Sequence, residues 1–159
     1  MTGSMDESEW PLMDRALDEA RRCLAWGDVP VGAVVSRGKD VLGAAGNQRE
    51  RLGDPTAHAE ILALRQASRR LGTWRLDGCD LWVTLEPCAM CGGAMVLARL
   101  GRLVFGAAEP KAGFAGSLGN LLQDARLNHR VDVVPGVRAE ESAVLLHEFF
   151  ATRRGGRDH

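Results

Sequence analysis

The sequence contains no tyrosine, and its aromatic residues are four tryptophans and four phenylalanines in 159 positions. So small a number argues against an RNA-binding sheet that stacks bases on surface aromatics. An excess of charge is also missing, because 20 lysines and arginines face 21 aspartates and glutamates, which gives a formal net charge of -1. This balance excludes a broad surface for duplex nucleic acid, so any nucleic acid must be held by a local basic patch.

Long apolar segments and abundant cysteines are absent as well. The longest apolar run, Val29 to Val35, is far shorter than the roughly 20 residues of a membrane-spanning helix. The acidic segment Met1 to Glu9 lacks the basic and apolar regions of a signal peptide. Four cysteines are too few for the disulfide framework of a small secreted protein. We therefore expect a cytoplasmic protein that makes no contact with a membrane.

The length of the chain fits one domain, since domains typically hold roughly 100 to 200 residues. We predict a single domain over residues 9–154, a disordered N-terminal segment over 1–8 and a flexible tail over 155–159.

Hydrophobic periodicity and turn residues predict alternating helices and strands within this domain. Asp54, Pro55 or Thr56 could each be the N-cap of the second helix, and with Asp54 as the cap Pro55 takes the first helical position. We expect one mixed sheet of five strands in which helical crossovers make neighbouring strands parallel. The predicted helices cover 10–25, 54–71, 88–99 and 138–153, the strands cover 29–36, 40–47, 79–85, 102–107 and 131–134, and a long glycine-containing segment covers 109–127.

Three residues with metal-binding side chains lie where predicted helices begin. Cys88 and Cys91 are three positions apart, so on a helix both sulfurs reach one ion, and His58 lies near the start of the preceding helix. One histidine and two cysteines leave a tetrahedral zinc one position short, as in catalytic sites that keep a water molecule. Cys23 and Cys79 lie in apolar surroundings, where we expect them to pack.

Two other interpretations of these residues stay open. His129, His147 or His159 could complete a closed structural zinc site, or the two cysteines could form a redox pair. The combination of H-x-E with a later P-C-x-x-C is, however, typical of zinc-dependent deaminases. We therefore favour an open catalytic zinc site.

Glu60 is the candidate proton shuttle, because a carboxylate beside zinc-bound water can pass its proton to a substrate nitrogen. Residues two apart point roughly 200° apart on a regular helix, so His58 and Glu60 converge only if the first turn is irregular. Glu86 is the rival base, although we expect it to hold backbone or ligand groups.

These residues sit within longer motifs that resemble the cytidine deaminase-like superfamily and, within it, the bacterial tRNA-specific adenosine deaminases. The resemblance runs from about Trp10 to Arg154 and implies a three-layer α/β/α fold. The motifs that carry it are Val29-Pro30-Val31-Gly32-Ala33-Val34, Asp54-Pro55-Thr56-Ala57-His58-Ala59-Glu60, Leu85-Glu86-Pro87-Cys88-Ala89-Met90-Cys91, Gly116-Ser117-Leu118 and Asn128-His129-Arg130-Val131.

The resemblance implies hydrolysis of a wobble adenosine in a tRNA anticodon to inosine. It implies a homodimer with one zinc ion per subunit, held by His58, Cys88 and Cys91, and with Glu60 as the shuttle. Asn47 would then hydrogen-bond the flipped nucleotide, while Val29 and the backbone around Ala59 wall the base pocket.

The resemblance also implies contacts to the anticodon loop from the segment after strand 102–107 and from the last helix. We expect one of Phe149 and Phe150 to pack and the other to stack on a base. The sequence Glu109-Pro110 departs from the family pattern, which puts the contact of Glu109 in question. The remaining candidate contacts are Glu109, Lys111, Phe150, Arg153 and Arg154.

Two other functions are compatible with the same residues. The chain could deaminate a free base, nucleoside or nucleotide of the cytidine or guanine type. It could also be an inactive zinc-containing RNA-binding module.

Overall fold

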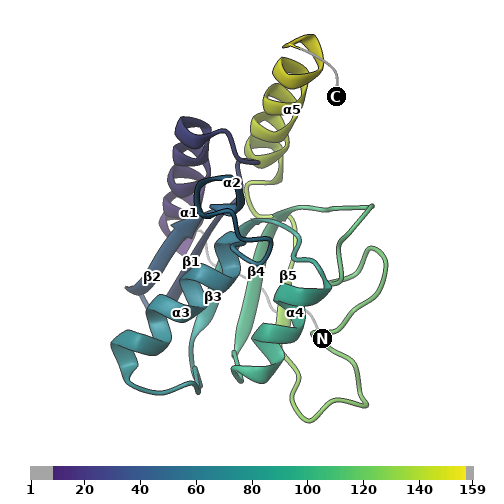
Figure 1. Cartoon of the computed structure of the whole chain (residues 1–159). Coiled ribbons are helices and arrows are strands. Elements are labelled where there is room, and N and C mark those ends of the chain that lie inside the picture. The colour runs from purple at the N-terminus through teal and green to yellow at the C-terminus, as the bar shows by residue number, and fades with distance from the viewer. Residues whose placement is uncertain (1–8, 157–159) are drawn as a thin grey trace.

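The computed structural model describes the backbone of residues 9–156 and the side chains of residues 9–153. The predicted disordered segment 1–8 and residues 157–159 of the predicted tail lie outside this range, as does the side chain of Arg154. Within it the elements are α1 (Trp10–Arg22), η2 (Cys23–Trp26), β1 (Gly32–Arg37), β2 (Asp40–Gly46), α2 (Arg49–Leu52), α3 (Ala59–Leu71), β3 (Asp80–Leu85), α4 (Ala89–Leu97), β4 (Arg102–Ala107), β5 (Asp132–Val134) and α5 (Ala139–Gly156) (Figure 1).

The five strands form one mixed sheet in the order β2-β1-β3-β4-β5. Strands β1 and β2 form the predicted antiparallel hairpin, and β3, β4 and β5 run parallel to one another. The prediction that crossovers make neighbouring strands parallel holds for β3 and β4. It is wrong for β1 and β3, which are antiparallel, because the crossover through α3 starts from β2 and β1 lies between β2 and β3.

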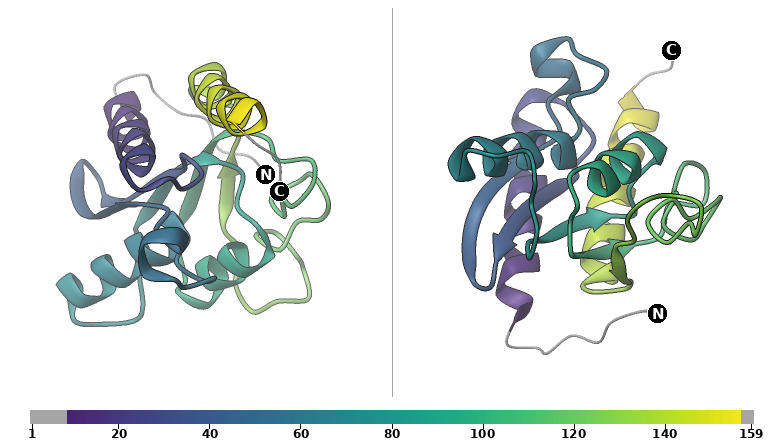
Figure 2. Two further views of the ribbon diagram at one scale, coloured as in Figure 1. Left: turned by 45° about the horizontal axis from the view of Figure 1, so that its top comes forward. Right: turned by 90° about the horizontal axis from the view of Figure 1, so that it is seen from below.

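Helices cover both faces of this sheet, which gives the three-layer α/β/α architecture (Figure 2). Alternate residues of β3 face opposite layers, because side chains alternate across a strand. Leu81 and Val83 join the core beneath α3 and α4, whereas the fully buried Trp82 joins the core beneath α1. Helix α5 packs against β3 and β4 on the same face as α1.

The start of α3 differs from the predicted one. The helix begins at Ala59, with His58 as its N-cap in an extended conformation. Asp54 instead accepts hydrogen bonds from the backbone N–H and the hydroxyl of Thr56, at 2.8 Å each. The prediction of a helix from residue 54 is wrong because this local turn satisfies the polar groups that a helix cap would have used.

Three further features differ from the predicted elements. The first helix ends at Arg22, and the 3-10 turn η2 closes on Gly27, whose φ of 72° lies in the left-handed region. The short helix α2, which the sequence patterns did not indicate, follows β2 directly. At the other end of the chain, α5 continues to Gly156, two residues into the predicted tail.

Between residues 9 and 156, no helix combines the length and the apolar character that crossing a membrane requires.

Candidate active site

The side chains of His58, Cys88 and Cys91 meet where α3 and α4 begin. His58 Nδ1 lies 3.7 Å from Cys88 Sγ and 3.5 Å from Cys91 Sγ. His58 and Cys88 are the N-cap residues of their helices, and Cys91 lies in the first turn of α4. The positive ends of two helices therefore meet at this cluster and favour negatively charged sulfur.

The protonation of the two thiols depends on their contact with each other. A hydrogen bond from Cys91 lowers the pKa of Cys88 to about 3, and the same contact raises the pKa of Cys91. A hydrogen bond to Cys88 also raises the pKa of His58. The imidazole and the two thiols are thus coupled in their protonation. A bound divalent cation would release protons from the thiols, because cysteine binds metal as thiolate.

The donor set fits a metal ion. Two sulfurs and one imidazole nitrogen are ligands that zinc prefers, and the ligand atoms all lie within 4.8 Å of one another. Within residues 9–153 the group comprises these three side chains alone. His129 Nε2 instead lies 2.6 Å from the carbonyl oxygen of Leu100, so it does not complete a closed site.

Glu60 lies on the first turn of α3 and is only 4% exposed. Because His58 is the N-cap and not a helical residue, the expected divergence of the two side chains does not arise, and both line the same pocket. Burial raises the pKa of Glu60 to about 7. A carboxyl with such a pKa can both accept and donate a proton near neutral pH.

Glu86 is fully engaged by the segment that follows β4. One of its oxygens accepts from the backbone N–H of Glu109 at 2.9 Å and the hydroxyl of Ser117 at 2.5 Å. The other accepts from the backbone N–H groups of Ala115 and Ser117, at 3.0 and 2.9 Å. Burial alone would raise the pKa of Glu86, but these donors hold it below its usual value.

This network gives Glu86 a positioning role. A carboxylate has about four acceptor sites, and four donors occupy them here. A Cβ on Gly113 would overlap the Glu86 carboxylate, so the segment can pass this close only with glycine at that position. The expectation that Glu86 holds backbone groups matches these contacts.

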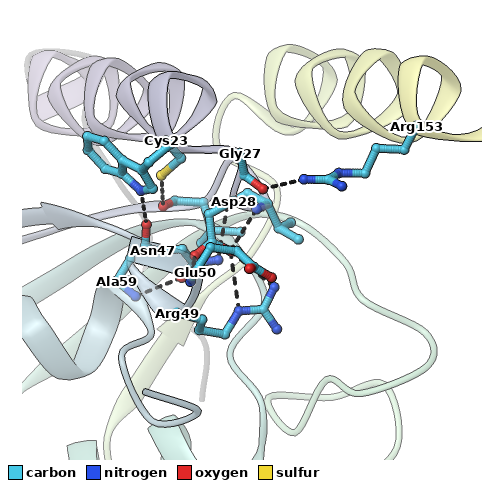
Figure 3. Close-up of polar contacts among 11 residues, drawn as sticks. Cys23, Gly27, Asp28, Asn47, Arg49, Glu50, Ala59 and Arg153 are labelled. Carbon is cyan, nitrogen blue, oxygen red and sulfur yellow. Dashed lines mark hydrogen bonds and ion pairs between the residues drawn. The ribbon is translucent and has the colours of Figure 1, made fainter. Parts of the chain in front are cut away.

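Asn47 connects the hairpin to the start of α3. Its Oδ1 accepts from the backbone N–H of Ala59 at 2.8 Å, and its Nδ2 donates to the carbonyl oxygen of Val29 at 3.1 Å (Figure 3). Its own backbone carbonyl accepts from Trp26 Nε1 at 2.7 Å. The amide thus fixes the pocket wall, and one donor and one acceptor site of the side chain remain for a ligand.

The pocket beside the metal-ligand group has a volume of about 230 Å³. Of the predicted substrate contacts, Val29, Asn47, Glu109 and Phe150 line it together with His58, Glu60 and Cys88. Their roles toward a substrate stay predictions. Its other lining residues are Val31, Arg49, Leu85, Glu86 and Ala112.

Three predicted contacts lie outside this lining. Ala59 is fully buried, and its backbone N–H donates to Asn47 Oδ1. Lys111 is exposed on the segment after β4. Arg153 donates to the carbonyl oxygen of Gly27 and stacks 4.5 Å from the centre of the Phe149 ring. Arg153 therefore holds α5 against the loop beside the pocket.

Sequence reasoning missed the pair of Asp28 and Arg49. The two residues are 21 positions apart, yet Arg49 donates to Asp28 Oδ1 from both Nε and Nη2, at 3.3 and 3.1 Å. One sequence feature could have pointed to Arg49: it is a positively charged residue two positions after the candidate nucleotide contact Asn47.

A three-layer α/β/α fold with H-x-E and P-C-x-x-C at the starts of two helices defines the cytidine deaminase-like class of enzymes. The MafB19-like deaminase family model matches residues 5–154 of the chain. The tRNA-specific adenosine deaminase of Bacillus subtilis is 47% identical over 142 residues, which cover 89% of this chain and 88% of that protein. That of Aquifex aeolicus is 47% identical over 141 residues, covering 87% and 91%.

Solved structures agree with these sequence matches. One, from a study of A-to-I editing by tRNA deaminases at the wobble position of transfer RNA, has a TM-score of 0.82 and 43% identity, covering 86% of this chain and 99% of that one. A guanine deaminase from Nitrosomonas europaea has a TM-score of 0.76 at 26% identity, covering 95% and 87%. The chain belongs to the MafB19-like deaminases and, within them, to the family of tRNA-specific adenosine deaminases.

Proposed function

We propose that this protein hydrolyses adenosine to inosine at the wobble position of a tRNA anticodon, in a single domain spanning residues 9–154. Zinc, one ion per subunit, is held by His58, Cys88 and Cys91, and Glu60 carries the proton. The observation that supports this most strongly is the shared pocket of His58, Cys88 and a buried Glu60 in a member of this family. A tRNA substrate implies a cytoplasmic location.

The reaction replaces an amino group by oxygen, and each part of the site has a task in it. Zinc at this site would supply a water nucleophile at neutral pH, because the metal lowers the pKa of water. A Glu60 oxygen takes a proton from the water and delivers it to the purine ring nitrogen beside the reacting carbon. The second water proton then passes through Glu60 to the amino group, the carbon–nitrogen bond breaks, and ammonia leaves.

The remaining pocket residues serve binding in this proposal. The free donor and acceptor sites of Asn47 suit a nucleoside, and Val29 packs against the base. Phe150, which is 41% exposed at the pocket, is the residue for stacking on a neighbouring base. Glu109 and Lys111 lie on the segment that Glu86 holds, where they meet the anticodon loop.

The direct test is an assay for inosine in an anticodon stem-loop RNA with adenosine at the wobble position. The zinc-loaded protein is expected to form inosine there, with affinity that falls as salt rises because phosphate contacts release counterions. A zinc-loaded preparation that yields no inosine would refute the proposal.

The likeness to a guanine deaminase makes a free base the second candidate substrate. Competition separates the two candidates. If the stem-loop is the substrate, free guanine and free adenosine are poor substrates and do not compete with it. Efficient turnover of free guanine without inhibition by RNA would favour the second candidate.

We also propose that the protein forms a homodimer through the groove between α3 and α4. The groove of about 510 Å³ is lined mainly by apolar groups, and Leu97 and Trp74 are 71% and 60% exposed there. Arg75 and Arg99 stack on Trp74, 5.4 and 6.0 Å from its ring centre, and so hold this aromatic in place. A second copy of the same surface would bury these side chains in a symmetric contact.

Sedimentation measurements test the dimer. Leu97→Glu is expected to shift the protein toward monomer, since it places a charge in the groove. Val144→Glu is the matched control, because Val144 is 53% exposed on α5, on the other face of the sheet. A monomeric wild-type protein, or equal effects of both substitutions, would contradict this interface.

A further inference from the structure

The pocket is lined by acidic side chains, whereas the proposed substrate is a nucleotide with negatively charged phosphates on both sides. Three carboxylates line it, those of Glu60, Glu86 and Glu109. Zinc with two thiolates and a neutral imidazole adds no net charge. Within the described part of the chain, Arg49 is the one lysine or arginine among the lining residues. A nucleotide whose phosphates approach this pocket therefore has a single fixed cation to meet.

Arg49 lies at the pocket with part of its guanidinium free. Its Nε and Nη2 donate to Asp28 Oδ1, and its side chain is 39% exposed (Figure 3). Two of its five N–H groups are used in these bonds, which leaves three for a ligand. Arg49 lines the same pocket as His58 and Cys88, so the guanidinium lies on the substrate side of the metal-ligand group.

Asp28 is held in place independently of Arg49. Its side chain is 0% exposed and accepts from the backbone N–H groups of Val29 and Glu50, at 2.8 and 3.0 Å. It therefore joins the loop before β1 to the start of α2. A carboxylate fixed in this way restricts the long side chain of Arg49 to one direction before any ligand binds, which lowers the entropic cost of binding.

We propose that Arg49 binds the phosphate next to the target nucleoside, and that Asp28 is its positioning residue. This inference rests on the proposed function. A guanidinium suits the task because its planar N–H groups match two phosphate oxygens and it keeps its charge at all physiological pH values. A role in proton transfer does not suit it for the same reason.

The test combines substitutions at Arg49 with neutral phosphates in the RNA. Inosine formation is measured on the wobble-adenosine stem-loop and on the same RNA with methylphosphonates on both sides of the target nucleoside. Arg49→Gln is expected to lower kcat/KM about 10- to 100-fold on the natural RNA, the range expected for a charged hydrogen bond. On the neutral RNA its effect is expected to shrink to within about twofold.

Arg51→Gln is the matched control, because it removes a positive charge from the same short helix. Arg51 is exposed, stacks on Trp26 and does not line the pocket. Arg49→Lys keeps the charge and serves as the second variant, with an intermediate loss that also shrinks on the neutral RNA. Zinc content and thermal unfolding confirm that each variant is folded.

Three results would overturn the inference. They are full activity of Arg49→Gln, an equal loss on both RNAs, and an equal loss in Arg51→Gln. An inactive wild-type protein on the natural RNA would instead refute the proposed function itself, so the two failures are distinguishable.

Asp28→Asn tests the positioning role. If Asp28 acts through Arg49, Asp28→Asn lowers kcat/KM on the natural RNA and has a smaller effect on the RNA with neutral phosphates. A loss that is equal on both RNAs would show that Asp28 contributes only to folding.

Discussion

Glu60 is a carboxyl group that the fold buries beside the candidate metal ligands. It is 4% exposed, it contacts Cys91, and burial raises its pKa to about 7. Glu86, the rival candidate base, accepts four hydrogen bonds from the segment after β4, and these occupy all of its acceptor sites. Of the two carboxyl groups, Glu60 is therefore the one that can exchange protons during turnover.

Glu60→Gln is expected to lower kcat by about 10²- to 10⁴-fold, the usual contribution of acid–base catalysis, because an amide cannot carry the proton. Zinc content and melting temperature are expected to stay near those of the wild type. Metal analysis and inosine assays on the purified variant measure both. Glu140→Gln, an exposed carboxyl on α5, is the control. Retained turnover in Glu60→Gln would contradict the assignment.

Single residues were predictable from the sequence where their chemistry is encoded locally. Cys88 and Cys91 are three positions apart at a helix start, so their spacing predicted that the two sulfurs converge. The addition of His58 depended on the combined motifs that are typical of zinc-dependent deaminases. Asp28 and Arg49 carry no such spacing. Their contact depends on where β1 and α2 place them in space, which a single sequence does not show.

At the scale of elements, a close backbone contact between β1 and α1 and hydrogen bonds from two side chains hold the segments that surround the site. Gly32 on β1 lies directly against the backbone of α1, where a Cβ would overlap the carbonyl of Ala16. Asn47 and Glu86 fix the hairpin and the segment after β4 by hydrogen bonds. The pocket is therefore held by contacts of three separate segments.

Glycine-to-alanine substitutions at Gly32 and Gly93 are expected to change stability in opposite directions, because only Gly32 lies against another backbone segment. Gly32→Ala is expected to lower the free energy of unfolding by at least about 1–3 kcal/mol, because it overpacks the contact with α1. Gly93→Ala on α4 has open space for its Cβ and is expected to raise stability by up to about 1 kcal/mol. Urea unfolding measures both. Equal effects of the two substitutions would contradict the proposed packing.

The fold class and most strands were predictable because their hydrophobic patterns are strong. The start of α3 was not, since Asp54 and Pro55 have the residue types of a helix start but form a separate turn. This error mattered for the site, because an N-cap at His58 is what brings His58 and Glu60 into one pocket.

At the scale of the whole molecule, the metal-ligand group joins two halves of the chain. His58 is the N-cap of α3, Cys88 is the N-cap of α4, and Cys91 lies in the first turn of α4. A bound ion would therefore link two helices that lie on the same face of the sheet. Binding a ligand to the folded state alone stabilises that state. Zinc is therefore expected to contribute to stability as well as to turnover.

Removal of zinc by a chelator is expected to abolish activity and lower the melting temperature, and one equivalent of zinc per chain is expected to restore both. Cys88→Ser is expected to lose the metal. Cys79→Ala is the control, because Cys79 is equally a free cysteine but is buried away from the group. Loss of zinc in Cys79→Ala, or full activity of the metal-free protein, would contradict this site.

The central claim is that the chain replaces the amino group of one tRNA adenosine by an oxygen from water. Its most direct test is a reaction of the zinc-loaded protein with a tRNA carrying wobble adenosine, in water enriched in heavy oxygen. Mass spectrometry of the nuclease fragments is predicted to find inosine at the wobble position alone, carrying one heavy oxygen. Unchanged adenosine at that position, or inosine without the label, would contradict the account.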